Sequence, residues 1–380
     1  MEFNLTEEQI AVRDAARDFA QNVLKPGVIE RDTEQRFPAE EVKQLGELGF
    51  MGMMVDPQYG GSGMDTVSYV LAMEEISKID ASTSVCMSVN NSLVTWGLEA
   101  YGTEEQKQKF LTPLASGQKI GAFCLSEPEA GSDATSQRTT AIDMGDHYLL
   151  NGTKNWITNG NSASTYLVMA QTDADKGHRG INCLVVERDM EGFQIGAKED
   201  KLGIRGSDTH TLMFQDVKVP KENRIGEDGF GFKFAMKTLS GGRIGIAAQA
   251  LGIASGALEL ATQYSKERKA FGKEISKHQA IAFKLADMAT EIEAARLLCL
   301  KAAWLKDNGQ DYALASSIAK LYASEVAMKH TVEAVQIHGG YGYVKEYHVE
   351  RLMRDAKITQ IYEGTSEVQK IVISRDLLQD

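Results

Sequence analysis

The 380-residue chain has few cysteines and lacks the common glycine-rich nucleotide motifs, and each absence excludes a class of site. The four cysteines are scattered without any Cys-x-x-Cys pair: Cys86, Cys124, Cys183 and Cys299. The sequence therefore predicts neither a metal site nor a disulfide framework, and it favours a reducing cytoplasm. Neither Gly-x-Gly-x-x-Gly nor a Walker A motif is present, so a Rossmann dehydrogenase is disfavoured and any redox cofactor must be held in another way.

Long hydrophobic runs are also missing. No run approaches the ~20 apolar residues that a membrane-spanning helix needs. The first residues, Met-Glu-Phe-Asn-Leu-Thr, have neither the basic nor the apolar region of a secretory signal. We therefore expect no membrane partner.

Basic residues are outnumbered, with 41 Lys and Arg against 53 Asp and Glu and a net charge of −12. This balance argues against a nucleic-acid partner, because binding phosphates requires concentrated Lys and Arg. A local basic cluster does occur at Lys266, Arg268, Lys269 and Lys273. From the residues alone it is either a solvated helix end or a local anion site.

The pattern of apolar residues divides the chain into helical, β and helical parts. A capping box at Thr6-Glu7-Glu8-Gln9 opens the first helix, and helical spacing recurs to about residue 116. Short apolar runs separated by Gly, Asn and Asp then indicate strands to about residue 220. Long helical patterns follow, notably at 243–266, 277–306 and 311–337. We predict a multidomain α+β fold with domains at 1–120, 121–230 and 231–380.

The stretch Ile361-Tyr362-Glu363-Gly364-Thr365-Ser366-Glu367 contains the candidate catalytic residue. Glu363 lies between an aromatic ring and a glycine, a setting that suits a general base. The ring and the preceding apolar residues exclude water and raise the pKa of the carboxyl, while Gly364 leaves its N–H open to a substrate oxygen. The same residues also suit a helix entry, with Thr365 or Ser366 as N-cap of a final helix through Leu378.

Four further segments accompany this stretch in a fixed order: Leu125–Asp133, Trp156–Gly160, Arg268–Gly272 and Gln336–Tyr343. With them, the chain resembles the FAD-dependent acyl-CoA dehydrogenases, most closely the short-chain (butyryl-CoA) type, from about residue 1 to residue 380. The resemblance implies an N-terminal all-α domain, a middle β-barrel-like domain and a C-terminal four-helix bundle. FAD is expected between the last two.

The resemblance also assigns residues to the cofactor. Family positions that contact the flavin ring by backbone and hydroxyl groups correspond to Phe123, Leu125 and Ser126. Those that cover one side of the ring and hydrogen-bond near N5 correspond to Trp156, Ile157 and Thr158. Those that hold the pyrophosphate and adenosine half correspond to Arg268, Phe271, Gln279, Gln336, Gly339 and Gly340, and in the family much of this contact comes from a neighbouring subunit. Thr365 and Glu367 match positions near the cofactor. From the residues alone, Trp156 could also be a core anchor, and the last two could be helix-entry residues.

For the substrate, Ser132 matches a position near the pantetheine arm and the cofactor, and Tyr362 and Gly364 flank the base. Ser240-Gly241-Gly242-Arg243 is expected to open the helix that lines the CoA site. An exposed arginine in a first helical turn is unfavourable, because the helix N-terminus is positive, so Arg243 suits a nucleotide partner. Many relatives have Asp at the position of Ser240, and the hydrogen bond to CoA is expected to change accordingly.

The reaction implied by the resemblance is dehydrogenation of an acyl-CoA to a trans-2-enoyl-CoA. Glu363 removes the α proton while the β carbon delivers hydride to flavin N5, and the thioester oxygen is polarised by the Glu363 N–H and an FAD ribityl hydroxyl. The implied partners are acyl-CoA, an electron-transfer flavoprotein and further copies of the chain in a homotetramer. The implied pathway is fatty acid β-oxidation.

Several alternatives remain open at this stage. A branched short-chain acyl-CoA dehydrogenase or an acyl-CoA oxidase would use the same base and flavin. A glutaryl-type enzyme would need a cation for the distal carboxylate, and Ser84 stands at the corresponding place, so that activity is disfavoured. A catalytically silent assembly member of the family is the non-enzyme alternative, against which the intact Glu363 and the acidic balance count. A straight-chain C4 substrate is our expectation, on overall resemblance only.

Overall fold

The computed structural model describes residues 4–378. Its first helix begins at the predicted capping box, where Thr6 Oγ1 accepts a hydrogen bond from the Gln9 N–H at 3.2 Å and Gln9 Oε1 accepts one from the Thr6 N–H at 3.0 Å. The helices of this region are α1 (Glu7–Phe19), α2 (Val28–Glu34), α3 (Ala39–Glu47), α4 (Thr66–Ile79), α5 (Ala81–Ser88), α6 (Trp96–Tyr101), α7 (Glu104–Gln106) and α8 (Thr112–Ala115). A π-helical segment, η4 (Val89–Thr95), joins α5 to α6.

A mixed sheet follows. Its strands are β1 (Gly121–Cys124), β2 (Thr140–Asp143), β3 (His147–Thr158), β4 (Thr165–Gln171), β5 (Ile181–Glu187), β6 (Phe193–Lys198), β7 (Thr209–Pro220) and β8 (Arg224–Ile225). The strand order is β6-β7-β3-β2-β4-β5-β8, and β1 pairs with β4 in parallel. The register of β3 against β7 shifts between Lys154 and Ile157, so the end of β3 bulges away from the ladder at Trp156.

The remaining helices are long and lie against one another. They are α9 (Gly231–Glu267), α10 (Gln279–Asp307), α11 (Ala313–His338), α12 (His348–Thr359) and α13 (Ser366–Leu377). A hairpin of β9 (Lys269–Ala270) and β10 (Lys273–Glu274) separates α9 from α10, and a 3-10 turn, η10 (Gly339–Tyr343), follows α11. Contacts of α9 and α11 with each other and with α10 and α12 form the predicted C-terminal four-helix bundle.

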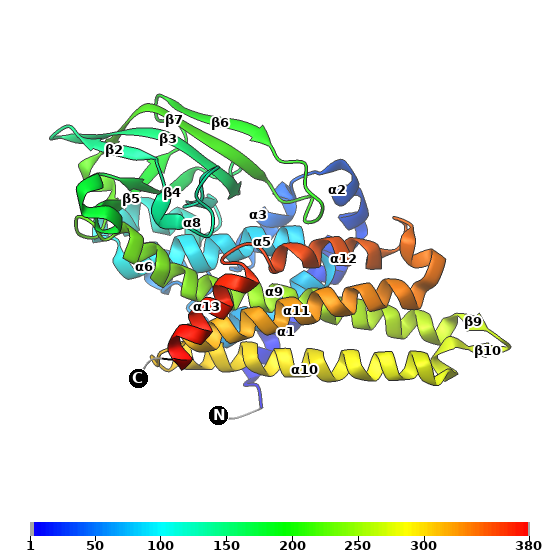
Figure 1. Ribbon diagram of the computed structural model, residues 1–380. Helices are drawn as coiled ribbons and strands as arrows, with labels where there is room; N and C mark the ends of the chain where they lie inside the picture. The colour runs from blue at the N-terminus through cyan, green and yellow to red at the C-terminus, as the bar shows by residue number, and fades with distance from the viewer. Residues whose placement is uncertain (1–3, 379–380) are drawn as a thin grey trace.

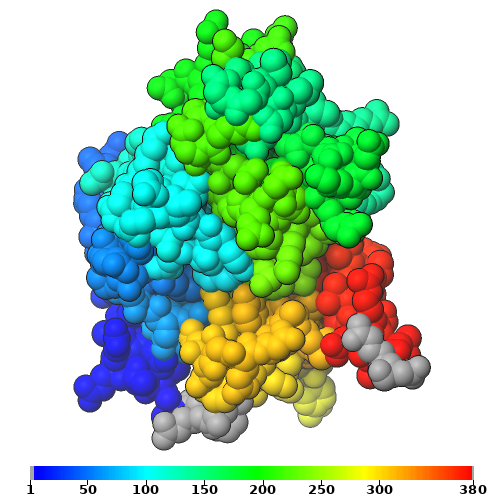
Figure 2. All heavy atoms as spheres, turned by 90° about the vertical axis from the view of Figure 1, so that its left-hand side faces the viewer, coloured from blue at the N-terminus to red at the C-terminus, as the bar shows by residue number. Residues whose placement is uncertain are grey.

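Figure 1 shows the sheet as a layer above the helices, with α10 on the side farthest from it and the β9–β10 hairpin projecting at one end. Figure 2, turned by 90°, shows the N-terminal helices (blue to cyan) on one side and α13 (red) on the other. The fold has two hydrophobic cores. One fills the space among both helical regions and the adjoining sheet face, and the other lies on the opposite sheet face around Tyr148, Tyr166 and Phe214.

Glycines allow α9 to approach α4 closely. A Cβ at Gly252 would collide with the carbonyl oxygen of Glu74, and one at Gly256 would lie 2.5 Å from that of Lys78. The small residues that interrupt the apolar pattern of α9 are therefore packing positions. They let the backbone of α9 pack directly against the second half of α4.

By length and composition, α9 is the one helix among residues 4–378 that could cross a membrane, with a mean hydropathy of 1.5 over 18 residues. Within the fold, 83% of that window is buried. Its apolar character is that of the central helix of a bundle, which is hydrophobic on all sides.

Two expectations about helix ends meet the structure differently. Thr365 is the N-cap of α13 and accepts a hydrogen bond from the Val368 N–H, so the helix-entry interpretation is confirmed, although the helix ends at Leu377. The expectation that Ser240–Arg243 opens a helix is wrong. Helix α9 begins at Gly231, which places these residues in its third and fourth turns, because Ser and Gly serve close packing there and do not mark a helix start.

Candidate active site

Glu363 lies in the short turn between α12 and α13, in a backbone conformation unusual for a residue with a side chain. Its φ is 51°, and that of Gly364 is 93°. The turn is tied to the preceding helix by the Tyr362 N–H, which donates to the Ile358 carbonyl at 3.1 Å, and to the following helix by the Thr365 cap. Left-handed backbone at a non-glycine residue costs free energy and is found where a side chain must be held in a set direction.

The carboxylate of Glu363 points inward. Its Oε2 atom is fully buried and has no hydrogen-bond partner among residues 4–378. A Cβ placed at Gly242 on α9 would collide with this atom. Burial raises the pKa of the carboxyl to about 7, and the cations Lys320 and then Arg243 oppose that rise. A buried, unpartnered carboxylate with a pKa near neutrality is the expected form of a general base.

Arg243 is buried in the fourth turn of α9, with 8% of its surface exposed. The disfavoured alternative, an arginine exposed to solvent in a first helical turn, is therefore excluded. One guanidinium nitrogen donates to Ser317 Oγ at 3.2 Å, and Nε has no partner among the described residues. Ser240, one turn earlier, donates its hydroxyl to the Met236 carbonyl within α9 at 3.2 Å. In this structure the Ser240 hydroxyl is used inside the helix, whereas Arg243 has hydrogen-bonding capacity left for a ligand.

Polar side chains from three helices lie next to the Glu363 turn. The Tyr362 hydroxyl donates to Gln249 Oε1 on α9, and Gln249 Nε2 donates to the Ala81 carbonyl at 2.9 Å and to Ser84 Oγ at 3.2 Å on α5. On α4, the Tyr69 hydroxyl donates to Ser88 Oγ at 3.0 Å. These bonds tie the residue before the base to the first helical region. Burial keeps the pKa of the Tyr362 hydroxyl well above its usual value, so it remains neutral.

The segments assigned to the flavin ring converge at one edge of the sheet. The Asn155 N–H donates to the Ser126 carbonyl at 2.9 Å, which joins the loop after β1 to the end of β3. Trp156, in the bulge, has a φ of 61° and 59% of its surface exposed, so it is not a core anchor. Phe123 stacks on Phe234 of α9 at 6.5 Å between ring centroids.

Not every residue of this group presents its side chain to a ligand. Ile157 is 1% exposed and belongs to the sheet core, so only its backbone faces the site. Leu125 is buried, whereas Ser126 and Thr158 are half-buried. Ser132 lies exposed in the loop before β2.

A buried lysine supports the same loop from behind. Lys154 Nζ donates to the Leu125 carbonyl at 3.0 Å, to Glu127 Oε1 at 2.8 Å and to Gln137 Oε1 at 3.0 Å. Glu127 in turn accepts the N–H groups of Arg138 at 2.5 Å and Thr139 at 3.0 Å. This buried network fixes both ends of the 125–139 loop to β3, the strand that contains Trp156.

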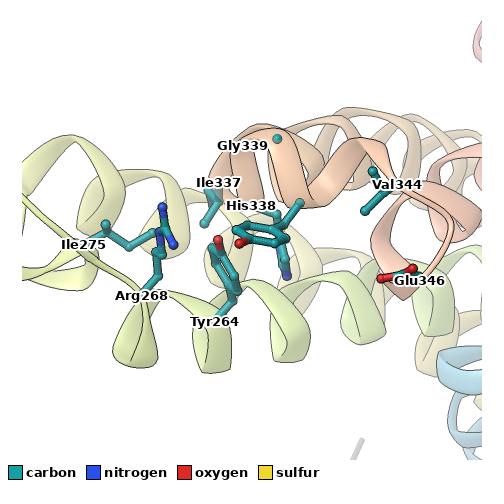
Figure 3. A pocket seen from close by; sticks show the side chains of 10 residues that line it. Tyr264, Arg268, Ile275, Ile337, His338, Gly339, Val344 and Glu346 are labelled. Carbon is teal, nitrogen blue, oxygen red and sulfur yellow. The ribbon is translucent and has the colours of Figure 1, made fainter.

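The residues assigned to the other half of the cofactor lie elsewhere. A cavity of about 610 Å³ opens between the ends of α9 and α11. Figure 3 shows Tyr264 of α9 and Arg268, which directly follows this helix, projecting toward Ile337, His338 and Gly339. A Cβ at Gly339 or Gly340 would meet nothing within 4 Å. The remaining members of this group are exposed on the same end of the bundle: Phe271, Gln279 and Gln336.

Within one chain, the structure does not bring this cavity together with Glu363. Gly242 faces the carboxylate from within α9, and Arg268 lines the cavity just beyond the end of the same helix. The two residues are 26 positions apart. At about 1.5 Å per residue, that separation is roughly 40 Å. Phe123 of the flavin-ring group stacks on Phe234 near the start of α9, whereas Arg268 follows its last residue, so the two assigned halves of the cofactor site lie at different ends of this helix.

Three family models cover nearly the whole described chain. They are the acyl-CoA dehydrogenase N-terminal domain at residues 6–118, the middle domain at 122–217 and the C-terminal domain at 229–378. The chain belongs to the acyl-CoA dehydrogenase family. Among curated relatives, a short-chain specific acyl-CoA dehydrogenase of Clostridium acetobutylicum is 54% identical over 374 residues, covering 98% of this chain and 99% of the relative. One from Megasphaera elsdenii is 52% identical over all of both chains.

Solved structures of acyl-CoA dehydrogenase relatives agree in fold. Butyryl-CoA dehydrogenase from Megasphaera elsdenii matches with a TM-score of 0.98 at 52% identity, covering all of both chains. A chain from a study of the electron transferring flavoprotein of Acidaminococcus fermentans and flavin-based electron bifurcation matches with a TM-score of 0.99 at 54% identity, again over all of both chains. A glutaryl-coenzyme A dehydrogenase in complex with glutaryl-CoA matches with a TM-score of 0.96 at 37% identity.

The residues present fit the flavin cofactor of this family. An exposed indole at the end of β3 offers a flat apolar wall, and open glycine backbone at Gly339 and Gly340 leaves room for a phosphate group beside Arg268. No group of three or more His, Cys, Asp or Glu side chains is arranged to hold a metal ion anywhere between residues 4 and 378.

Sequence reasoning missed three buried polar residues that bond to candidate site residues: Gln249, Lys154 and Lys320. Gln249 and Lys320 are fully buried on α9 and α11, among small and apolar neighbours. The sequence does contain a signal for Gln249 and Lys320, because each is a long polar residue inside a helical run of Ala, Gly and Ser. Long polar residues are rarely buried without a hydrogen-bond partner, so each one predicts a polar contact with another part of the chain.

Proposed function

We propose that the protein catalyses the FAD-dependent α,β-dehydrogenation of a short-chain acyl-CoA, with butyryl-CoA as the favoured substrate and Glu363 as the α-proton base. The observation that carries this proposal is the buried and unpartnered Oε2 atom of Glu363, directed at Gly242 of α9. A carboxylate in that state has unused basicity and is shielded from water. The short-chain specific relatives support the choice of substrate.

The chain's own residues account for the proton transfer. Glu363 takes the proton from the α carbon, and its pKa near 7 lets the ionised form exist at neutral pH. Its backbone N–H has no partner among residues 4–378 and is available to the thioester oxygen, whose polarisation acidifies the α proton. FAD, when bound, accepts the hydride from the β carbon.

We assign the cofactor to two groups of residues. The flavin ring would be held by Phe123, Leu125, Ser126, Trp156, Ile157 and Thr158, with Thr365 and Glu367 nearby. The pyrophosphate and adenosine half would be held by Arg268, Phe271, Gln279, Gln336, Gly339 and Gly340. Because Arg268 lies roughly 40 Å along α9 from Gly242, which faces Glu363, the second group would serve the cofactor of a neighbouring chain.

We further assign the substrate to Ser132, Ser240, Arg243, Tyr362 and Gly364. Arg243 is buried with an unpartnered Nε and suits an anionic or carbonyl group of the CoA moiety. The hydrogen-bonded side chains of Tyr362, Gln249 and Tyr69 occupy volume on the inner side of the base. That filling favours a short acyl chain over a long one.

The proposed partners are an electron-transfer flavoprotein, which would accept the electrons, and further copies of this chain in a homotetramer. We propose a cytoplasmic location, which four buried and unpaired cysteines favour. The domain boundaries stay as proposed from the sequence, near residues 120 and 230.

An anaerobic titration tests the substrate and the reaction together. The FAD-loaded protein is titrated with acyl-CoAs of graded length and branching, and bleaching of the oxidised flavin is followed. We expect bleaching at the lowest concentration with butyryl-CoA. Stronger bleaching by a branched acyl-CoA would contradict the straight-chain assignment, rapid reoxidation in air would indicate an oxidase, and no bleaching by any acyl-CoA would indicate a silent family member.

A further inference from the structure

Lys320 on α11 is fully buried, with 0% of its surface exposed. The neighbouring buried positions of the helix are small, namely Ser316, Ser317, Ala319, Ala323 and Ser324. Among residues 4–378 no carboxylate lies within ion-pair distance of its ammonium group, whose hydrogen bond goes to the Gly364 carbonyl at 2.5 Å. An ammonium group buried without a paired carboxylate is costly, so its position requires an explanation in terms of the site it faces.

The Gly364 carbonyl belongs to the turn that carries the base. Lys320 Nζ at 2.5 Å and Gln369 Nε2 at 3.0 Å both donate to it, from α11 and α13 respectively. The two residues of the turn have positive φ angles, so the direction of this carbonyl follows from the same backbone conformation that directs the Glu363 side chain. Because the Gly364 carbonyl is held from two sides, the orientation of the Glu363 carboxylate is held as well.

Lys320 also contributes charge. The groups that act on the Glu363 carboxyl are Lys320 from α11 and Arg243 from α9, both cations. Tyr69 from α4 and Tyr362 from the turn are kept neutral by burial, and Glu325 and Glu367 act on Lys320. Lys320 is therefore the main positive charge that favours the ionised base.

We propose that Lys320 is a positioning residue for the dehydrogenation: it clamps the turn that carries Glu363 and supplies the buried positive charge that favours the ionised form of that carboxylate. The inference rests on the proposed function, since it assigns Lys320 to the base of that reaction. Gln369 on α13 shares the clamp and carries no charge, so it provides an uncharged control that donates to the same carbonyl.

The sign of the pH effect follows from the charges. Burial raises the pKa of Glu363 to about 7 and Lys320 lowers it, so removing the lysine moves the Glu363 pKa further up. The base of the variant then stays protonated up to a higher pH, so the loss of activity on acidification begins at a higher pH than in the wild type. Burial also lowers the pKa of Lys320 to about 8, so the wild-type lysine is charged at pH 6–7 and loses its influence as the pH rises above 8.

The test compares Lys320→Met with Gln369→Met in the FAD-loaded protein. Each variant removes one donor to the Gly364 carbonyl, but only the first removes a charge. The protonated carboxyl band of Glu363, identified by its loss in Glu363→Gln, is titrated by infrared difference spectroscopy, and the pH profile of kcat/KM is measured with butyryl-CoA. Lys320→Gln, which keeps a donor and loses the charge, serves as a second variant should the methionine variant fail to retain FAD.

We expect both Lys320 variants to shift the titration of Glu363 and the acidic limb of kcat/KM upward by at least half a pH unit. Gln369→Met should lower kcat/KM at all pH values without moving the limb. Profiles for both Lys320 variants that superimpose on the wild type, or an equal shift in Gln369→Met, would overturn the inference. The infrared titration needs no turnover, so it separates failure of this inference from failure of the proposed function, which would leave the wild-type flavin unbleached by acyl-CoA.

Discussion

At the residue scale, Glu363 combines a strained backbone with a buried and unpartnered carboxylate oxygen. Its neighbours explain how it can be held there. Tyr362 is tied to Gln249, Gly364 is clamped by Lys320 and Gln369, and Thr365 caps the next helix. The helix-entry and base interpretations of this stretch are therefore compatible, because the cap fixes the turn in which the base stands.

Gly242 on α9 lies directly opposite the carboxylate of Glu363. A Cβ there would collide with Glu363 Oε2, and it would lie 2.7 Å from Leu93 Cδ2. We predict that Gly242→Glu in a Glu363→Gly background recovers part of the flavin reduction lost in Glu363→Gly alone. Recovery should be incomplete, because a misplacement of ~1 Å can cost ~100-fold.

Stopped-flow flavin reduction in FAD-loaded variants measures this recovery. Gly241→Glu in the same background is the matched control, because the Cβ of residue 241 would approach Ser92 and Lys306 and not the turn. Equal rates for the Gly242 and Gly241 double variants would show that residue 242 does not face the reacting carbon.

At the element scale, the bulge at the end of β3 and the 125–139 loop act as one unit, held together by Lys154. We predict that Lys154→Met weakens FAD retention and destabilises the fold by about 3 kcal/mol, because it leaves Glu127 buried without its cation. Flavin content after gel filtration and thermal unfolding measure the two effects. Lys109→Met removes an exposed ion pair with Glu187 and should change neither, so equal losses in both variants would contradict the assignment.

The elements differ in how far the sequence predicts them. The capping box at Thr6 and the long apolar patterns of α10 and α11 are local signals, and the structure agrees with them. The prediction that α9 opens at Ser240–Arg243 is wrong, because Gly and Ser have low helix propensity and resemble a helix start. The contacts that outweigh this local cost lie on α4 and in the Glu363 turn, far away in the sequence. The bulge at Trp156 depends on β7, a strand some 50 residues later, so no local pattern indicates it.

At the scale of the whole molecule, the cavity beside Arg268 lies far from Glu363 in the same chain. The order of motifs in the sequence predicts both groups of residues but not their separation, which follows from the length of α9. Exposed apolar side chains at this end, with Phe271 at 96% exposure, are consistent with contact to another chain.

We predict that Arg268→Ala loses FAD and the oligomer together, since one side chain would serve both. Light scattering with and without bound FAD measures the assembly, and flavin absorbance measures the cofactor. Lys273→Ala is a suitable control, because Lys273 is exposed in the hairpin that follows Arg268 and its side chain bonds only to the Lys277 carbonyl among the described residues. A stable monomer that retains FAD would contradict the shared site.

The central claim is that Glu363 removes the α proton, and Glu363→Gln tests it most directly. The amide keeps the size of the side chain and removes its basicity, so the variant should retain FAD and still bind butyryl-CoA. Anaerobic stopped-flow measurement of flavin reduction should then show a rate lower by several orders of magnitude. A rate within about tenfold of the wild type, equivalent to ~1.4 kcal/mol in the barrier, would contradict the assignment.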